Sequence, residues 1–167
     1  LGNATAIVDN PNGAQYIAQL PSNAFDTDLF PSGGNVQGAI QAVSMPSGQG
    51  VMFHVEFSGL PASGGPFLYH IHDQPVPADG NCTGTLAHLD PYQRGEEPAC
   101  DASLPETCQV GDLSGKHGSI NGTDFSTTFT DEFASTLTGI GAFFGNRSFV
   151  LHFANTTRIT CANFTAV

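Results

Sequence analysis

Glycine and proline recur at short intervals along the whole sequence, and this punctuation constrains the fold more than any other feature. The 167 residues include 20 glycines and 11 prolines. Both residue types interrupt helices, and no long run keeps the apolar spacing of an amphipathic helix. Short apolar runs bounded by turn residues lie between the interruptions. The pattern predicts an all-β domain, either a sandwich or a barrel.

Eight runs have the length and composition of strands. We expect strands at residues 4–8, 15–19, 36–43, 50–58, 67–72, 126–130, 148–153 and 158–164. Gly38, inside the third run, indicates a bulge. The chain is long enough for one core and too short for two, so we expect a single domain over residues 1–167.

The segment between Asp73 and Gly118 does not alternate and is rich in turn residues, including Pro75, Pro77, Pro91, Pro98 and Pro105. It is interpreted as a long functional loop. A loop of this length inside a compact domain has to be tied down. Three of the four cysteines lie in this segment, so disulfides can supply the ties.

The four cysteines form an even set without the Cys-x-x-Cys spacing of zinc ribbons or redox motifs, which favours disulfides over metal thiolates. Spacing alone leaves three pairings open. Cys100 and Cys108 are close enough in the sequence for a local disulfide. Cys82 and Cys161 would then form a disulfide that closes a loop of nearly half the chain.

Acidic residues dominate the charge of the chain. Four Lys and Arg residues face fifteen carboxylates, for a formal net charge of -11. Such a surface repels phosphate, so we expect no nucleic-acid binding. No stretch approaches the roughly 20 apolar residues that cross a bilayer, so this segment is expected not to insert into a membrane.

Six Asn-x-Ser/Thr sequons are typical of the secretory route. With the disulfides, they predict a processed, soluble, secreted glycoprotein with an extracellular location, associated with a cell wall. The acceptor asparagines are Asn3, Asn81, Asn121, Asn146, Asn155 and Asn163.

Four histidines have a pattern that indicates a metal site. His70 and His72 are separated by one residue at the end of an apolar run, and a strand would place both imidazoles on one face. His88 lies in the long loop, and His152 lies in an apolar run where an unpaired imidazole would be costly to bury. Imidazole suits copper and zinc, and four nitrogen ligands are close to the preference of Cu(II).

Taken together, the ordered motifs resemble the copper–zinc superoxide dismutase superfamily, and most closely its extracellular, copper-only fungal branch. The resemblance spans nearly the whole chain and rests on His70-Ile71-His72, Cys82, His88-Leu89-Asp90-Pro91, Gly111-Asp112-Leu113, Phe149-Val150-Leu151-His152 and Arg158-Ile159-Thr160-Cys161. It implies an eight-stranded Greek-key barrel, a Cys82–Cys161 disulfide, and one copper ion held by His70, His72, His88 and His152.

The resemblance also implies roles for two catalytic residues. The arginine that matches Arg158 guides superoxide and donates hydrogen bonds to it. The histidine that matches His88 leaves Cu(I) and carries a proton. The implied activity is the conversion of superoxide to dioxygen and hydrogen peroxide, an antioxidant function, and we expect a monomer.

Two departures from the zinc-containing members favour a site without zinc. Residues 89–108 contain no histidine, and Gln109 stands where those members have another ligand. Only five residues separate His152 from Arg158, which predicts a copper site open to solvent. Asp112 or Glu106 is expected to be the carboxylate that orients a ligand imidazole.

Other interpretations remain for individual residues. His54 is expected to be a hydrogen-bonded structural residue and His117 an exposed loop residue. The alternative for Arg158 is a surface arginine paired with a carboxylate. The alternative for Asp112 is a residue that shapes a turn. For the whole chain, the main alternative is a non-catalytic copper storage or delivery module on the same fold. A purely adhesive sandwich would leave His88 and His152 unexplained.

Overall fold

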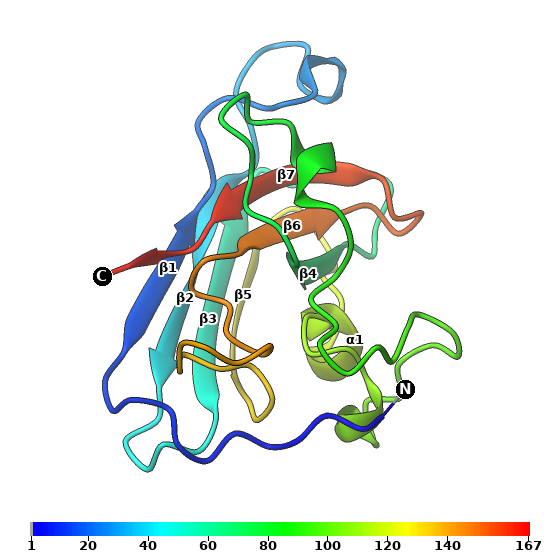
Figure 1. Cartoon of the computed structure of the whole chain (residues 1–167). Coiled ribbons are helices and arrows are strands. Elements are labelled where there is room, and N and C mark those ends of the chain that lie inside the picture. Colours follow the sequence, from blue (N-terminus) through cyan, green and yellow to red (C-terminus); the bar gives the residue numbers. More distant parts are fainter. Residues whose placement is uncertain (1) are drawn as a thin grey trace.

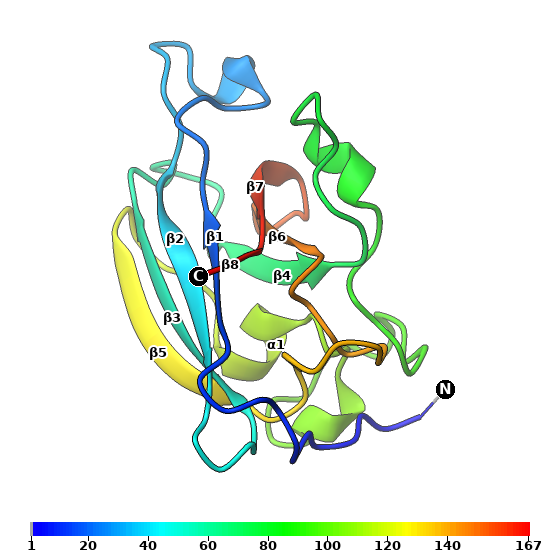
Figure 2. The ribbon, with the colours of Figure 1, turned by 60° about the vertical axis from the view of Figure 1, so that its left-hand side comes forward.

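The fold consists of two antiparallel β-sheets that face each other (Figures 1 and 2). The computed structural model describes residues 2–167. The larger sheet has the strand order β5 (Phe125–Asp131), β3 (Val51–Ser58), β2 (Gln37–Ser44), β1 (Gln15–Gln19), β8 (Thr165–Ala166). The smaller sheet has the order β4 (Leu68–His72), β6 (Ser148–His152), β7 (Arg158–Asn163). The predicted all-β sandwich is confirmed.

The strand predicted at residues 4–8 is wrong. Ala4 and Ile7 are buried, but their N–H groups donate singly to the carbonyls of Glu106 and Glu132, both at 2.8 Å, and form no ladder. The apolar side chains hold this segment against the core as irregular chain. At the other end of the chain, β7 stops at Asn163 and the chain changes sheet, so that Thr165 pairs with Ile17 of β1.

The bulge expected at Gly38 is also wrong, because the β2–β3 register runs through this position without a shift. The glycine has another cause. Gly38 has φ +130°, and a Cβ atom there would lie 1.9 Å from the carbonyl oxygen of Glu56. The close approach of the neighbouring strand therefore requires glycine.

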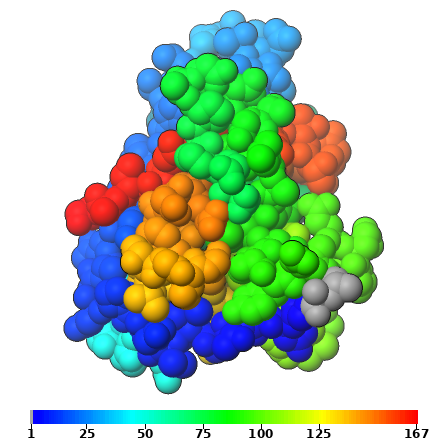
Figure 3. Space-filling view, viewed as in Figure 1, coloured from blue at the N-terminus to red at the C-terminus, as the bar shows by residue number. Residues whose placement is uncertain are grey.

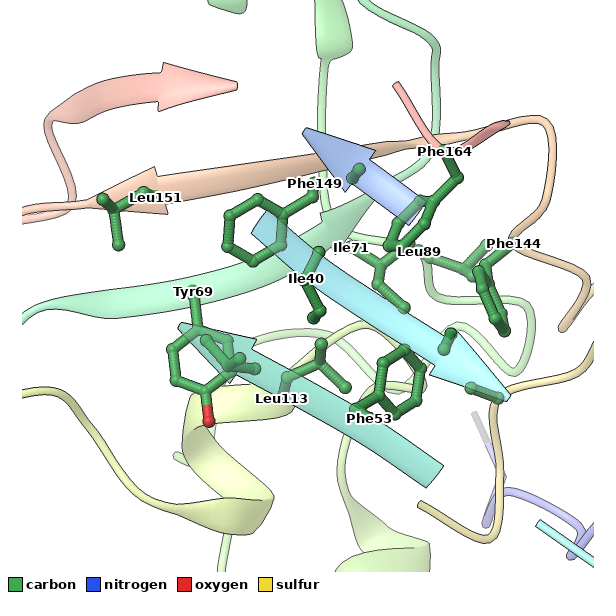
Figure 4. Packing of buried hydrophobic residues seen from close by; sticks show 14 of the residues in the cluster. Ile40, Phe53, Tyr69, Ile71, Leu89, Leu113, Phe144, Phe149, Leu151 and Phe164 are labelled. Carbon is green, nitrogen blue, oxygen red and sulfur yellow. The ribbon is translucent and has the colours of Figure 1, made fainter. Parts of the chain in front are cut away.

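The core lies between the sheets, and strand alternation decides which side chains enter it (Figure 4). Tyr69 and Ile71 of β4 and Phe149 and Leu151 of β6 point inward and are fully buried. Ile40 and Phe53 of the larger sheet belong to the same core, as do Leu89, Leu113, Phe144 and Phe164. Because side chains alternate, His70, His72 and His152 are left on the opposite face of the smaller sheet.

The loop after β4 covers that opposite face and contains three short helices. They are η2 (Cys82–Thr85), η3 (Pro105–Thr107) and α1 (Leu113–His117). The structure pairs Cys82 with Cys161 of β7 and Cys100 with Cys108. In the space-filling view the loop, in green, lies against the segment before β6, in orange (Figure 3). Within residues 2–167 no helix is long and apolar enough to cross a membrane.

A buried ion pair fixes α1 against β5. Lys116 Nζ lies 2.6 Å from Asp131 Oδ2 and donates to the carbonyl of Val110 at 2.9 Å. His117, expected to be exposed, is instead mostly buried: Nε2 lies 2.8 Å from Asp131 Oδ2 and the ring stacks on Phe129. Burial raises the pKa of Asp131, but the Lys116 charge and the hydrogen bonds from both partners outweigh it and hold that pKa far below the usual range.

Candidate metal centre

The centre is a group of four imidazoles on the outer face of the smaller sheet. His70 and His72 alternate along β4, and His152 of β6 lies across from Leu68, one pleat from His70. A register shift between Leu151 and His152 changes the local direction of β6 at the ligand. His88 reaches the group from the covering loop through a bridge to His72. One ring nitrogen from each histidine lies within 4.8 Å of the other three.

Two of these nitrogens are in direct contact. Nδ1 of His70 and Nδ1 of His152 are 3.1 Å apart, and both rings are buried. Two neutral imidazoles can share at most one proton across such a contact, so at least one lone pair points into the group. A metal ion would engage both lone pairs.

The backbone fixes the tautomer of His72. Its Nδ1 lies 2.9 Å from the carbonyl oxygen of Leu86, which can only accept, so Nδ1 carries the proton. Nε2 of His72 is then an acceptor, and it is buried without a hydrogen-bond partner in residues 2–167. A buried nitrogen lone pair without a partner is costly, and a metal ion in the group would satisfy it. The residues therefore fit a metal ion.

A chain of three side chains fixes the tautomer of His88 in the same way. The carboxylate of Asp90 can only accept, so the Nε2 amide group of Gln109, 3.2 Å away, donates to it. Oε1 of Gln109 then faces Nδ1 of His88 at 2.7 Å and accepts its proton. Nε2 of His88 remains free for a metal. Spacing gave no sign of this role, because it depends on the fold bringing Asp90 to the amide.

Asp112 contacts both His70 and the start of α1. Its Oδ1 lies 3.4 Å from Nε2 of His70, and it also accepts from the N–H of Gly115 at the start of α1. Glu106 forms no ion pair with a histidine in the described chain. A carboxylate that the sequence analysis did not single out, that of Glu96, lies 3.4 Å from Nδ1 of His88.

Burial favours the neutral form of His72, His88 and His152. Desolvation, with smaller contributions from the neighbouring histidines and Arg158, lowers the pKa of His72 to about 3 and that of His152 to about 2. Desolvation and the nearby His70 also lower the pKa of His88, although Gln109 opposes the shift. Neutral imidazoles have free lone pairs at neutral pH, as metal ligation requires.

Arg158 borders the group. It begins β7, pairs with His152 across the β6–β7 hairpin, and lines the same cavity of about 440 Å³ as the four imidazoles. Its guanidinium donates to the carbonyls of Cys82 and Leu86, both at 2.6 Å, and to Oγ1 of Thr85 at 2.7 Å. In residues 2–167 it pairs with no carboxylate, so its positive charge is not neutralised locally. Partial burial lowers its pKa from the usual value.

The remaining predicted site residues lie elsewhere. His54 is on the outer face of the larger sheet, where its Nδ1 lies 2.9 Å from Oγ1 of Thr128, as expected for a structural residue. The sequon residues Asn81 and Asn155 cap turns through Oδ1 and are exposed. Both amide atoms of Asn163 bond to the backbone of Val76.

The chain is similar to proteins from fungi. It is 42% identical to the "Cell surface Cu-only superoxide dismutase" of Arthroderma benhamiae, over 98% of this chain and 49% of that protein. It is 40% identical to "Cell surface superoxide dismutase [Cu-Zn] 6" of Candida albicans, over 88% of this chain and 46% of that protein. The chain thus spans about half the length of these relatives. No protein-family model matches it.

A solved structure agrees with the sequence comparison. The Cu(II) form of Candida albicans superoxide dismutase 5 superposes with a TM-score of 0.77 at 34% sequence identity, over 93% of each chain.

Proposed function

Because the chain belongs to the fungal cell-surface branch of the copper–zinc superoxide dismutase family, we propose that it binds one copper ion and disproportionates superoxide. The ligands in this proposal are His70, His72, His88 and His152. The observation that carries it is the convergence of four imidazole nitrogens within 4.8 Å, one of them a buried acceptor without a partner.

The donor set favours copper over other metals, since four imidazole nitrogens suit Cu(II). When bound, copper supplies one-electron redox chemistry. The overall reaction takes two superoxide anions and two protons to one dioxygen and one hydrogen peroxide. The chain must hold the imidazoles in place, admit a small anion and deliver protons.

Arg158 acts on the superoxide anion, and His88 acts on the proton. Arg158 places an unneutralised positive charge beside the imidazoles, so it attracts superoxide and donates a hydrogen bond to it. His88 holds one proton at Nδ1 against Gln109. Its Nε2 would bind copper, and it would carry a second proton only while it is not bound to the metal. Asp112 orients His70 through the 3.4 Å contact with Nε2.

We propose that the site takes no zinc. The covering loop has no histidine between His88 and Gln109, and Gln109 itself is engaged as a hydrogen-bonding amide between His88 and Asp90. A relative with 42% identity is named Cu-only.

We further propose that the protein is secreted, glycosylated at exposed sequons and associated with the cell surface, as the names of its relatives indicate. Two disulfides support an oxidising compartment. The net charge of -11 opposes binding to nucleic acid, and we propose a monomer.

Elemental analysis combined with a superoxide assay tests the proposal. We expect about one copper per chain, no zinc after dialysis against both metals, and rapid loss of superoxide. His152→Ala should lose copper and activity, while His54→Ala, which changes a histidine outside the group, should keep both. Copper binding without turnover would favour the storage module instead, and a tight equivalent of zinc would contradict the copper-only site.

A further inference from the structure

Leu86 adopts a backbone conformation that suits glycine and strains leucine. It has φ 59° and ψ -133° and follows η2 directly. Within residues 2–167 only three non-glycine residues have a positive φ, and the other two are Gln93 and Thr156. A strained residue persists where the surrounding structure holds it in place, and such residues cluster at functional sites.

Hydrogen bonds explain the backbone of Leu86 but leave its side chain unexplained. Its carbonyl oxygen accepts from Nδ1 of His72 at 2.9 Å and from Nη2 of Arg158 at 2.6 Å. A glycine would offer the same carbonyl with less strain. The reason for leucine therefore lies with the side chain.

Leu86 lines two neighbouring cavities. One is the cavity of about 440 Å³ that contains the imidazoles and Arg158, and the other, of about 390 Å³, is bordered by Asp73, Asp90 and Arg147. Leu86, Ala87 and His88 line both cavities. Of these three, only Leu86 offers a bulky apolar side chain, and it is 57% exposed.

We propose that the Leu86 side chain is a barrier that closes the imidazole group, and His88 above all, to molecules that enter from the second cavity. Access is then confined to the side where Arg158 provides positive charge, and that side favours a small anion. The second cavity is lined by the carboxylates of Asp73 and Asp90, the first of which is paired with Arg147 at 2.8 Å, so it offers no free cation to an anion. This inference rests on the proposed copper site.

Copper extraction by a neutral chelator tests the barrier. Leu86→Ala shortens the side chain and keeps the strained backbone, whereas Leu86→Gly removes the side chain and the strain. Leu104→Ala is the matched control, because Leu104 is a 50% exposed leucine at the start of η3 and does not line the imidazole cavity. The copper-loaded proteins are mixed with 2,2′-bipyridine, and the rate of copper transfer is followed by absorbance.

We expect transfer to be several-fold faster in both Leu86 variants and unchanged in Leu104→Ala, while the affinity of azide for Cu(II), read from the visible spectrum, stays the same. If copper transfer from both Leu86 variants is as slow as from wild type, Leu86 is not a barrier, and the proposed copper site is unaffected. Faster transfer in Leu86→Gly alone would assign the effect to the loss of backbone strain and also overturn the barrier. Copper loss on dialysis without chelator would show that Leu86 only positions the ligands. A wild type that holds no copper would overturn both proposals.

Discussion

At the scale of single residues, the candidate site depends on partners that decide which ring nitrogen carries a proton. The Leu86 carbonyl does this for His72, and the Gln109 amide does it for His88. The sequence predicted the four histidines because their spacing and apolar surroundings are visible in it. It did not predict the function of Gln109, which was interpreted only as a missing ligand. The tautomer of a histidine depends on contacts with residues that are distant in the sequence. The spacing of residues along the chain does not predict these contacts.

Replacing Gln109 should therefore weaken copper binding without removing a ligand. In Gln109→Ala, Nδ1 of His88 loses its acceptor and either tautomer becomes accessible, so we expect copper affinity to fall by roughly 10–100-fold. Competition titration against a chelator of known affinity measures this. Gln41→Ala, an exposed glutamine on the larger sheet, is the control. Equal affinities in wild type and Gln109→Ala would show that His88 needs no orienting amide.

At the scale of elements, the sequence predicted the strands well and the attachment of the covering loop poorly. Short apolar or alternating runs bounded by turn residues identify β1 to β7, because each strand packs at least one face against the core. Residues 4–8 resembled a strand but lack a partner, and pairing is a property of two segments. The helix α1, with five residues, is too short to show periodicity. The burial of Lys116 and His117 depends on Asp131 in another element.

The buried pair between α1 and β5 should set the acid stability of the fold. At pH 7 we expect Asp131→Asn to lower the free energy of unfolding by about 3–5 kcal/mol, because Lys116 is left buried without a counter-charge. The folded pKa of Asp131 lies below its unfolded value, so its contribution is present above about pH 4 and is lost as the pH falls through the folded pKa.

Urea unfolding at a series of pH values measures the contribution of Asp131. The difference between wild type and Asp131→Asn should narrow below about pH 4. Asp124→Asn, an exposed carboxylate next to β5, should stay close to wild type throughout. If the free energies of unfolding of wild type and Asp131→Asn differ by the same amount down to the lowest pH, the charge of Asp131 does not account for the stabilisation.

The two disulfides should contribute unequally. Cys82–Cys161 spans 79 residues and Cys100–Cys108 spans 8. The loop-entropy relation gives about 4–5 kcal/mol for the first and roughly 2.5 kcal/mol for the second, as upper values. Double Cys→Ser variants of each pair, compared by denaturant unfolding, should show this order. Peptide mapping without reduction should recover both pairs, and a Cys82–Cys100 peptide would contradict the pairing.

At the scale of the whole molecule, the net charge of -11 opposes the capture of an anion, and two cations, Arg158 and Arg94, line the cavity that contains the imidazoles. We expect Arg158→Ala to keep its copper and to lose about tenfold or more in rate at low salt. Added salt, with a Debye length of about 10 Å at 0.1 M, should raise the rate of the variant, because repulsion by the net negative charge then outweighs the attraction that Arg94 still provides.

Wild type should respond to salt less or in the opposite direction, because screening also weakens the attraction by Arg158. Rates over a range of ionic strengths, with the copper content of each sample measured, separate these cases. Full activity of Arg158→Ala at every ionic strength would make the arginine a surface residue. Loss of copper from Arg158→Ala would mean that the guanidinium of Arg158 holds η2 in place.

The proposed ligands are far apart along the chain: His70 and His152 differ by 82 in residue number, and only the pairing of β4 with β6 brings them together. An unfolded chain offers copper isolated histidines, so the complete site exists only after folding. In the proposed function, copper is a ligand of the native state and shifts the folding equilibrium by mass action, by about 2.7 kcal/mol when free copper is 100 times the dissociation constant. Metal supply in the surroundings would thereby govern how long each molecule resists unfolding and proteolysis.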